Sequence, residues 1–415
     1  MNQPNLLRSL FDEAVRVADP MICVPAHLPP KPDGKLLVIG AGKASARMGE
    51  ALESVWGPCN GLIITRYGYE RPLQGITLKS ASHPVPDEAG LLATRELRAM
   101  LEQANKDTFI LALISGGGSS LMIDPAGDMS LADKMAVNAA LLASGAPIDE
   151  MNVVRKHLSR IKGGQLAAAA YPARLHALMI SDVPGDDPAY IASGPTVGDS
   201  STPDDALAII ARYGIDLPAS AKAVLSGPTG VIPPGDERLS ITTNTIIAAP
   251  SQSLEAAKMI AEAAGIEVTI LGDALEGEAR NLAREQGAMA LKMQSKISTP
   301  HLLLSGGECT VTRTGDGVGG PNAEYALSLA IALNGADGIH ALACDTDGVD
   351  GAAEVAGAMV TPNTLAKARA KDIDPHASLA NNDAHSFFAG INDQVITGPT
   401  LTNVNDFRAI LIEPA

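Results

Sequence analysis

The run Phe109–Ile114 (FILALI) is a short apolar segment that leads directly into Ser115-Gly116-Gly117-Gly118-Ser119-Ser120. An apolar run of this length, followed by glycines, is typical of a strand that is buried on both faces of a sheet. Glycine leaves backbone N–H groups accessible because it has no Cβ, and the serine hydroxyls add further donors. The segment therefore predicts a buried strand followed by a loop that binds an anion such as phosphate.

Apolar runs alternate with segments of helical periodicity along the chain. Strands are predicted at 35–39, 61–65, 76–80, 109–114 and 175–181, with helices at 43–56, 87–104, 131–144 and 150–161. This alternation predicts a mainly parallel sheet with helices on both faces. Further strands are predicted at 245–249, 267–271 and 301–304, and further helices at 251–264 and 275–293. A second α/β unit is therefore expected.

Length and composition indicate where the two units meet. A chain of 415 residues exceeds what a single hydrophobic core usually organises, which favours two domains. The stretch 226–238 (SGPTGVIPPGDER) contains three prolines and three glycines and interrupts the alternation. We therefore predict a first domain over residues 1–235 and a second over residues 236–415.

The charge and the cysteines exclude several classes of function. A net charge of −16 argues against nucleic acid and anionic membranes as partners. The four cysteines lie far apart without a CxxC pair, so neither a zinc site nor a disulfide framework is predicted. No apolar run is long enough to span a membrane, and the acidic N-terminal helix is unlike a secretory signal. We expect a cytoplasmic protein.

The segment 40–45 (Gly-Ala-Gly-Lys-Ala-Ser) follows a predicted strand and begins a helix. Its pattern resembles that of a dinucleotide-binding loop. However, Ser45 occupies the position of the third glycine, and no acidic residue ends the next strand. A nicotinamide cofactor is therefore disfavoured. Gly42 and Lys43 instead favour an anion site, because the helix dipole and the ammonium group both attract negative charge.

A second positive segment interrupts this acidic chain. It contains Arg155, Lys156, His157, Arg160 and Lys162. Charged runs are usually solvated surface, but here the local sign is opposite to that of the whole chain. Anion binding and a solvated helix face are therefore equally consistent with the pattern.

Carboxylates follow one predicted strand and one further apolar run. Asp182 comes directly after the strand 175–181, and Asp345 and Asp347 follow the apolar run 339–343. Ligands of open α/β sheets bind at the carboxyl ends of strands, where such side chains can hold Mg²⁺ or accept a proton. Turn formation explains the same residues without a ligand.

Further polar candidates lie in small, glycine-rich segments. They are Ser193, Gly194, Glu308, Asn322 and Glu324. Glu308 ends a second strand-then-glycine pattern, in which the strand 301–304 is expected to lead into a loop at 305–308. This loop is expected to frame the site rather than to bind the anion, because Glu308 is negative. Glu324 is also explained as a helix cap.

These segments together resemble the glycerate 2-kinase family, whose C-terminal part is the MOFRL domain. The resemblance covers nearly the whole chain and rests on VIGAGKAS (38–45), LISGGGSSL (113–121), VRKHLSRIKGGQLA (154–167), ISDVPGDDPAYIASGPT (180–196), LSGGECTVT (304–312), GGPNAEYALSLA (319–330) and DTDGVDG (345–351). It implies a Rossmann-like N-terminal domain and a smaller C-terminal α/β domain with the MOFRL region at about 300–408. It also implies an active-site cleft between them, and a last strand that can pack back on the first domain.

The resemblance implies transfer of the γ-phosphoryl group of ATP to the 2-hydroxyl of D-glycerate, with Mg²⁺ or another divalent cation. It marks Lys43 as the lysine important for activity. Many relatives have GGRNQE where this chain has Gly-Gly-Pro-Asn-Ala-Glu, so that Pro321 replaces an arginine and Ala323 a glutamine. The role of that arginine would then pass to Arg155 or Arg313.

The expected site residues fall into four groups. Lys43, Asp182 and Arg155 are expected to act in catalysis; Gly42, Ser115, Gly116, Gly117, Gly118, Ser119, Ser120 and Lys156 to bind phosphate; Ser193, Gly194, Glu308, Asn322 and Glu324 to line the substrate site; Asp345 and Asp347 to hold metal. D-Glycerate and a nucleotide are the expected partners, and a homodimer is one possible assembly. An NAD(P)H-dependent hydroxypyruvate reductase and a non-catalytic sugar-phosphate-binding module remain the alternatives.

Overall fold

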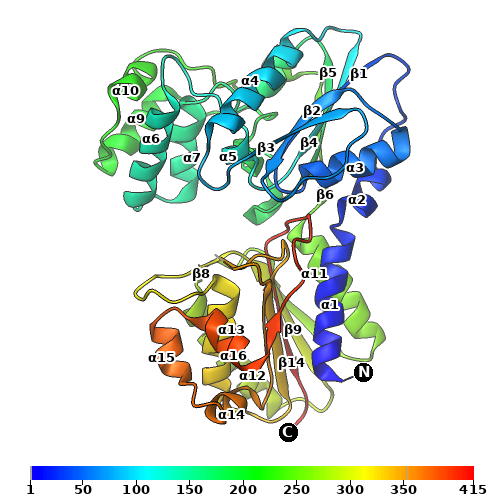
Figure 1. Cartoon of the computed structure of the whole chain (residues 1–415), viewed down its shortest axis with the longest axis vertical. Coiled ribbons are helices and arrows are strands. Elements are labelled where there is room, and N and C mark those ends of the chain that lie inside the picture. Colours follow the sequence, from blue (N-terminus) through cyan, green and yellow to red (C-terminus); the bar gives the residue numbers. More distant parts are fainter. Residues whose placement is uncertain (1, 352) are drawn as a thin grey trace. The chain divides into compact units, whose positions relative to one another are not determined.

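The computed structural model describes residues 2–351 and 353–415, in which helices alternate with the strands of two six-stranded sheets (Figure 1). The chain forms two compact units. The first-sheet unit contains Pro20–Asp182 and Asp186–Ile247. The second-sheet unit combines the chain up to Asp19 with Val183–Gly185 and Ala248–Ala415.

The first sheet has the strand order β3-β2-β1-β4-β5-β6. Its strands are β1 (Lys35–Ala41), β2 (Gly61–Arg66), β3 (Ile76–Ala81), β4 (Thr108–Ile114), β5 (Arg174–Ile180) and β6 (Thr242–Ala248). Neighbouring strands from β3 to β5 run parallel, which confirms the predicted mainly parallel sheet. Every residue of β4 is buried between β1 and β5, as its uniformly apolar sequence predicts.

The connections between these strands are mostly helical. They comprise α2 (Pro20–His27), α3 (Ser45–Trp56), α4 (Glu88–Glu102), α5 (Gly118–Leu121), α6 (Leu131–Ala143), α7 (Ile148–His157), α8 (Gln165–Ala170), α9 (Pro203–Arg212) and α10 (Ala219–Leu225), with 3₁₀ turns η1 (Pro184–Asp186), η2 (Ile191–Ser193) and η3 (Glu237–Leu239). Helices α6, α7, α9 and α10 gather into a helical group with its own apolar core (Figure 1). Val137, Leu141, Val154 and Ala206 are buried in that core.

The second sheet is mixed, with the order β13-β12-β11-β14-β9-β7. Its strands are β7 (Glu267–Gly272), β9 (His301–Gly307), β11 (Ile339–Asp345), β12 (Gly357–Val360), β13 (Gln394–Val395) and β14 (Asp406–Ile412), and β8 (Gly277–Glu278) pairs separately with β10 (Cys309–Thr310). Among the described residues of this sheet, only β7 and β9 are parallel neighbours, and the separate pair β8 and β10 is also parallel. The expectation that the last strand packs on the first domain is wrong, because β14 is buried throughout between β11 and β9.

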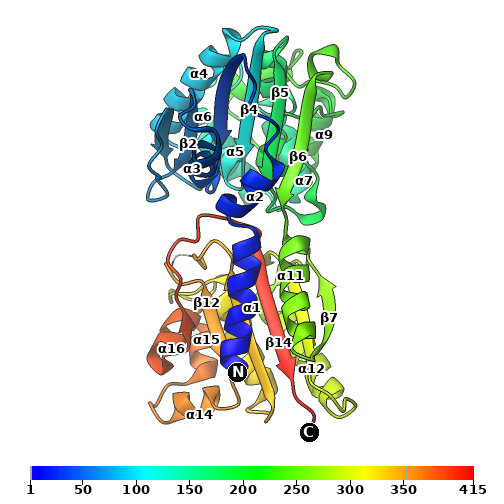
Figure 2. The same ribbon diagram turned by 90° about the vertical axis from the view of Figure 1, so that its right-hand side faces the viewer.

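Helices cover both faces of the second sheet (Figures 1 and 2). On one face α1 (Gln3–Val17) lies beside α11 (Pro250–Ala263). On the other face lie α12 (Ala279–Gln294), α13 (Pro321–Leu333) and α16 (Ala384–Ile391), accompanied by α14 (Thr364–Arg369) and α15 (Pro375–Ala380). No helix of the described residues is long and apolar enough to cross a membrane.

The two units do not match the predicted domains, which were divided after residue 235. Helix α1, from the predicted first domain, packs on the second sheet, and strand β6, from the predicted second domain, belongs to the first sheet. The apolar face of α1 is fully buried in the second-sheet unit through Leu7, Leu10, Phe11 and Ala14. The rings of Phe11 and Phe407 lie with their centroids 5.9 Å apart. Beyond residue 235, β6 completes the edge of the first sheet next to β5. The N-terminal helix therefore belongs with the second sheet.

Candidate active site

The loops that follow β1 and β4 lie side by side because these strands are parallel neighbours. The N–H of Lys43 donates to the carbonyl of Gly116 at 2.8 Å, and the N–H of Ser115 donates to the carbonyl of Ala41 at 3.2 Å. The Ser115 hydroxyl accepts the N–H of Ala44 at 3.0 Å. Ser115 is also fully buried, so its hydroxyl joins the two loops instead of facing a ligand.

Glycine is required where these loops meet. Gly42 has a φ of +146°, and a Cβ at this position would lie 2.0 Å from the Ser115 hydroxyl oxygen. Gly117 has a φ of +80°, and a Cβ there would lie 2.9 Å from the ring of His83 and 3.3 Å from Cγ of Lys43. The Lys43 side chain and the His83 ring therefore both lie against Gly117. The sequence did not identify His83 as a neighbour of this loop.

The loop 115–120 presents N–H groups that the chain itself does not use. The N–H groups of Gly118 and Ser120 donate to carbonyls within the loop. Those of Gly116, Gly117 and Ser119 have no acceptor within residues 2–351 and 353–415. Backbone donors without a partner are rare, and several that converge in a glycine-rich loop form an anion-binding concavity.

Ser119 connects this loop to the segment that follows β5. Its hydroxyl oxygen lies 2.9 Å from that of Ser193. The ammonium group of Lys162 donates to the Ser119 carbonyl at 2.7 Å and also to the Ser119 hydroxyl. Side chains from η2 and from the turn after α7 therefore both contact Ser119 of α5.

The backbone around Ser193 is held in an uncommon conformation. Ala192, Ser193 and Gly194 have φ values of +51°, +63° and +63°. The N–H groups of Gly163 and Gly164 hold this turn by donating to the carbonyls of Ser193 and Gly194, at 3.2 and 2.8 Å. Non-glycine residues seldom adopt positive φ, and when the surroundings impose it the residue is often functional.

Asp182 lies two residues beyond β5 and is half-buried. Because β1, β4 and β5 are parallel, their carboxyl ends lie on the same edge of the sheet. Lys43, the loop 115–120 and Asp182 are therefore on one edge, where ligands of open α/β sheets bind.

Four cationic side chains gather on α6, α7 and the turn that follows α7. Lys134, Lys156 and Lys162 are 3%, 3% and 2% exposed, and Arg155 is half-buried. Lys156 forms an ion pair of 2.5 Å with Asp199. The ammonium group of Lys134 and Nε of Arg155 have no hydrogen-bond partner in the described part of the chain.

Burial and mutual repulsion disfavour the charged forms in this group. Burial, together with the positive charge of Arg155, lowers the pKa of Lys134 to about 8. Burial, and then the charges of Lys134, Arg155 and Lys156, lower the pKa of Lys162 well below its ordinary value. Burial also lowers the pKa of Arg155. Such a group stabilises an anion that comes within reach.

The sequence identified most of this positive group but not Lys134. Of the basic segment, Lys156, His157 and Lys162 are buried and Arg155 is half-buried, whereas Arg160 is exposed. Lys134, Val137 and Leu141 occupy positions i, i+3 and i+7 of α6. Together they form the buried stripe of that helix. A lysine within an apolar helical stripe is the signal that could have identified it.

Asn322 and Glu324, at the start of α13, have structural partners in the second-sheet unit. The Asp350 carboxylate caps α13 by accepting the N–H groups of Asn322 and Ala323, at 2.9 and 2.8 Å. Glu324 is 1% exposed and accepts from Arg280 at 2.6 Å and from the side-chain amide of Asn382 at 2.9 Å. Both oxygens of Glu324 are therefore occupied within the protein.

Asp345 and Asp347 form consecutive turns. Oδ1 of Asp345 accepts the N–H of Asp347 at 2.8 Å, and Oδ1 of Asp347 accepts the N–H of Val349 at 2.8 Å. Within residues 2–351 and 353–415, no three His, Cys, Asp or Glu side chains are grouped so as to hold a metal ion. The carboxylates therefore fit turn formation better than a metal site built from protein ligands alone.

The second strand-then-glycine segment is not a loop. Strand β9 continues through Gly307, and a Cβ at Gly307 would lie 2.2 Å from the backbone nitrogen of Leu275. The guanidinium group of Arg408 donates to the carbonyls of Gly306 and Gly307 at 3.1 and 3.3 Å. The glycines therefore serve close packing, and only the exposed Glu308 lies beyond the strand.

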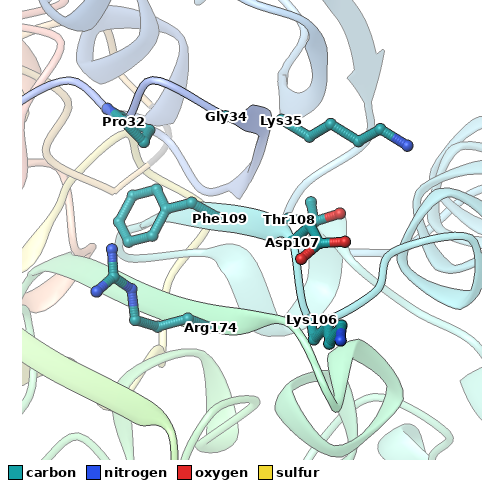
Figure 3. A pocket seen from close by; sticks show the side chains of 8 residues that line it. All are labelled: Pro32, Gly34, Lys35, Lys106, Asp107, Thr108, Phe109 and Arg174. Carbon is teal, nitrogen blue, oxygen red and sulfur yellow. The ribbon is translucent and has the colours of Figure 1, made fainter.

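A hollow of about 280 Å³ lies at the other edge of the first sheet, where β1, β4 and β5 begin (Figure 3). It is lined by Pro32, Gly34, Lys35, Lys106, Asp107, Thr108, Phe109 and Arg174. The Arg174 guanidinium lies 4.8 Å from the centroid of the Phe109 ring. Because this edge carries the amino ends of the strands, the hollow is not the candidate active site.

Known proteins match this chain over nearly its whole length. Residues 6–226 match a family model described as a domain of unknown function (DUF4147), and residues 301–406 match the MOFRL family. A relative from Agrobacterium vitis, provisionally named hydroxypyruvate reductase, is 53% identical over 98% of this chain and 94% of its own. The D-glycerate 2-kinase of Thermotoga maritima is 37% identical over 99% of this chain and 100% of its own. The crystal structure of glycerate kinase (EC 2.7.1.31) from Thermotoga maritima matches with a TM-score of 0.89 and 36% identity, covering 98% of this chain and 99% of that one.

Proposed function

Because the chain belongs to the glycerate kinase family, we propose that it transfers the γ-phosphoryl group of ATP to the 2-hydroxyl group of D-glycerate. The products are ADP and 2-phosphoglycerate. The full-length relative named D-glycerate 2-kinase supports this position of transfer. The structural observation that carries the proposal is the loop 115–120, in which three N–H groups have no acceptor among the described residues and which lies beside Lys43.

Phosphoryl transfer depends mainly on positioning the reactants and on neutralising the charge of the phosphoryl oxygens. In the proposed reaction the N–H groups of Gly116, Gly117 and Ser119 donate to phosphate oxygens. The Lys43 ammonium group, whose stem lies against Gly117, stabilises the negative charge on the transferred group. Asp182, on the same edge of the sheet, accepts the proton that the substrate hydroxyl loses.

We propose that Mg²⁺ is held mainly by the phosphates of the nucleotide. Mg²⁺ usually keeps several waters and binds proteins through one or two carboxylates together with substrate phosphates. The turns at Asp345 and Asp347 do not provide a protein-only site, which agrees with this arrangement. When bound, Mg²⁺ neutralises charge on the phosphate oxygens.

The reductase alternative depends on the provisional name of two relatives and lacks support at the site. A dinucleotide-binding loop needs a third glycine so that the helix can pack closely on the strand. Here Ser45 fills that position, is fully buried, and donates its hydroxyl to the Leu113 carbonyl at 2.9 Å. Ser45 therefore fills the space where that glycine would allow close packing.

The proposal is tested by incubating the purified protein with ATP, Mg²⁺ and D-glycerate and following the products by ³¹P NMR. We expect ADP and 2-phosphoglycerate in equal amounts, and no ADP when D-glycerate is omitted. Formation of 3-phosphoglycerate would contradict the position of transfer. Binding of D-glycerate without any ADP would contradict the kinase and favour the binding module.

A further inference from the structure

We propose that Lys134 and Arg155 bind the carboxylate of the acceptor substrate, and that Lys162 positions Ser119 beside them. The inference rests on the proposed function, because it assigns the anionic end of D-glycerate to this part of the first-sheet unit. It adds Lys134, and it assigns to Arg155 a role in binding the substrate carboxylate that neither the family resemblance nor the names of the relatives specify.

The main support for this proposal is the buried ammonium group of Lys134. It is buried within the helical group and has no hydrogen-bond partner in the described residues. Buried charges in proteins are almost always paired or hydrogen-bonded, because an unpaired ammonium loses its hydration without compensation. A lysine kept in this position is explained if an anion completes the site.

Arg155 provides the second free donor. Its Nε has no partner within residues 2–351 and 353–415, and its Nη1 makes only a 3.4 Å contact with Oδ1 of Asn152. A guanidinium group donates two parallel N–H bonds to a carboxylate, which gives both strength and orientation. Lys156 is less available, because it is paired with Asp199 and lies 5.4 Å from the ring centroid of Tyr190.

Lys162 connects the positive group to the phosphate-binding loop. It donates to the carbonyl and to the hydroxyl of Ser119, whose hydroxyl also contacts Ser193. The N–H of Ser119 is one of those proposed to hold phosphate. Ser119 therefore joins the positive group to the phosphate-binding loop, and Lys162 fixes the position of Ser119 through these hydrogen bonds.

This arrangement also favours one hydroxyl of the substrate. The 2-hydroxyl of glycerate is on the carbon next to the carboxylate, whereas the 3-hydroxyl is one carbon further away. A carboxylate held by Lys134 and Arg155 therefore keeps the 2-hydroxyl close to its anchor. The carboxylate is favoured over a nucleotide phosphate because the burial of Lys134 suits a compact anion better than a hydrated, metal-bound polyphosphate.

The test compares D-glycerate with its neutral methyl ester in the wild-type protein and in Lys134→Met. We expect the KM for D-glycerate to rise at least about tenfold, with the KM for ATP unchanged. The preference for D-glycerate over the ester, as a ratio of kcat/KM values, should fall by a similar factor. Without substrate, Lys134→Met should also have a melting temperature a few degrees above that of the wild-type protein, because the buried, unpaired charge of Lys134 is removed. Lys222→Met, on the exposed face of α10, is the control. It should change neither the KM for D-glycerate nor the preference for D-glycerate over the ester.

Other outcomes would overturn the assignment. A higher KM for ATP would assign Lys134 to the nucleotide, and an equal loss with acid and ester would make its role structural. If Lys134→Met does not fold, Arg155→Gln provides the same comparison. If the wild-type protein forms no ADP, the proposed function fails, but the carboxylate site is still tested by whether D-glycerate raises the melting temperature of the wild-type protein more than the ester does. Equal stabilisation by both would contradict the site.

Discussion

Lys43 is the residue whose removal should affect the reaction most. The Lys43→Ala variant should lower kcat at least about tenfold, because a charge-assisted contact with a phosphate contributes about 1.5–3 kcal/mol. The fold should persist, since the loop is joined by the backbone of Lys43 and by Ser115. Steady-state kinetics with a circular dichroism check measure both effects. Lys79→Ala is the control, because Lys79 is a partly exposed lysine that pairs with Glu96, and near-normal turnover in Lys43→Ala would remove Lys43 from the mechanism.

Lys134 should give the stability of the free protein a specific pH dependence. Its pKa is lowered from 10.5 to about 8 in the folded state, so between these values the unfolded chain binds more protons. The free energy of unfolding therefore rises with pH across this window, by about 3 kcal/mol from this group, and the cost of burial is complete below pH 8.

Urea unfolding at pH 7 and pH 9.5 measures this contribution. The wild-type protein should gain stability relative to Lys134→Met as the pH rises. If the free energies of unfolding of the two proteins changed equally with pH, the charged form of Lys134 would not destabilise the folded protein. That result would contradict an unpaired buried ammonium group.

Single residues differ in how far the sequence reveals them. Lys43 and the loop 115–120 were predicted because a strand, a glycine turn and a helix start are local patterns. Lys134 was not predicted, since its environment is created by α7 and by the turn at Lys162. Glu324 was assigned to the substrate site because its partner Arg280 is 44 residues away and no local pattern indicates it.

At the scale of elements, the junction between the β1 and β4 loops depends on Gly42. The Gly42→Ala variant should separate these loops and abolish most of the turnover, because its Cβ would overlap Ser115 and its φ is unfavourable for alanine. Gly68→Ala is a matched control, since Gly68 also has a positive φ, of +84°, but has open space around it. Activity and melting temperature should change little in the control, and an equal loss in both variants would make backbone strain the only cause.

The elements themselves were largely predictable. Strands β1 to β5 of the first sheet begin and end within two residues of the predicted positions, because short, mainly apolar runs leave few alternatives, whereas β6 begins three residues before its predicted start. Strand β9 was predicted to end at Leu304, since Ser-Gly-Gly usually marks a loop, yet it continues to Gly307. Its continuation depends on pairing with β14 and on the close approach of Leu275, which are distant in sequence.

At the scale of the whole molecule, the N-terminal helix stabilises the second-sheet unit. The Phe11→Ala variant should lower the free energy of unfolding by about 3–5 kcal/mol, because its buried ring packs against Phe407. Amide hydrogen exchange should become faster in β9, β14 and α11 while β1 and β4 are unaffected. The converse control is Leu101→Ala in α4, which should affect the first sheet. Faster exchange in β1 and β4 of Phe11→Ala would contradict this assignment.

The order of elements along the chain could not reveal this arrangement. An amphipathic helix shows which of its faces is buried but not which sheet covers it. A boundary at 226–238 was a reasonable prediction from prolines and glycines, yet β6 and α1 join their sheets from opposite sides of it.

The kinase assignment is tested most directly by measuring both candidate reactions in one preparation of the wild-type protein. ADP formation with D-glycerate, ATP and Mg²⁺ is compared with the oxidation of NADH and NADPH in the presence of hydroxypyruvate. We expect ADP and 2-phosphoglycerate to form in step, with no oxidation of either nicotinamide cofactor above a no-enzyme control. Oxidation of NADH or NADPH without any formation of ADP would contradict the assignment and establish the reductase instead.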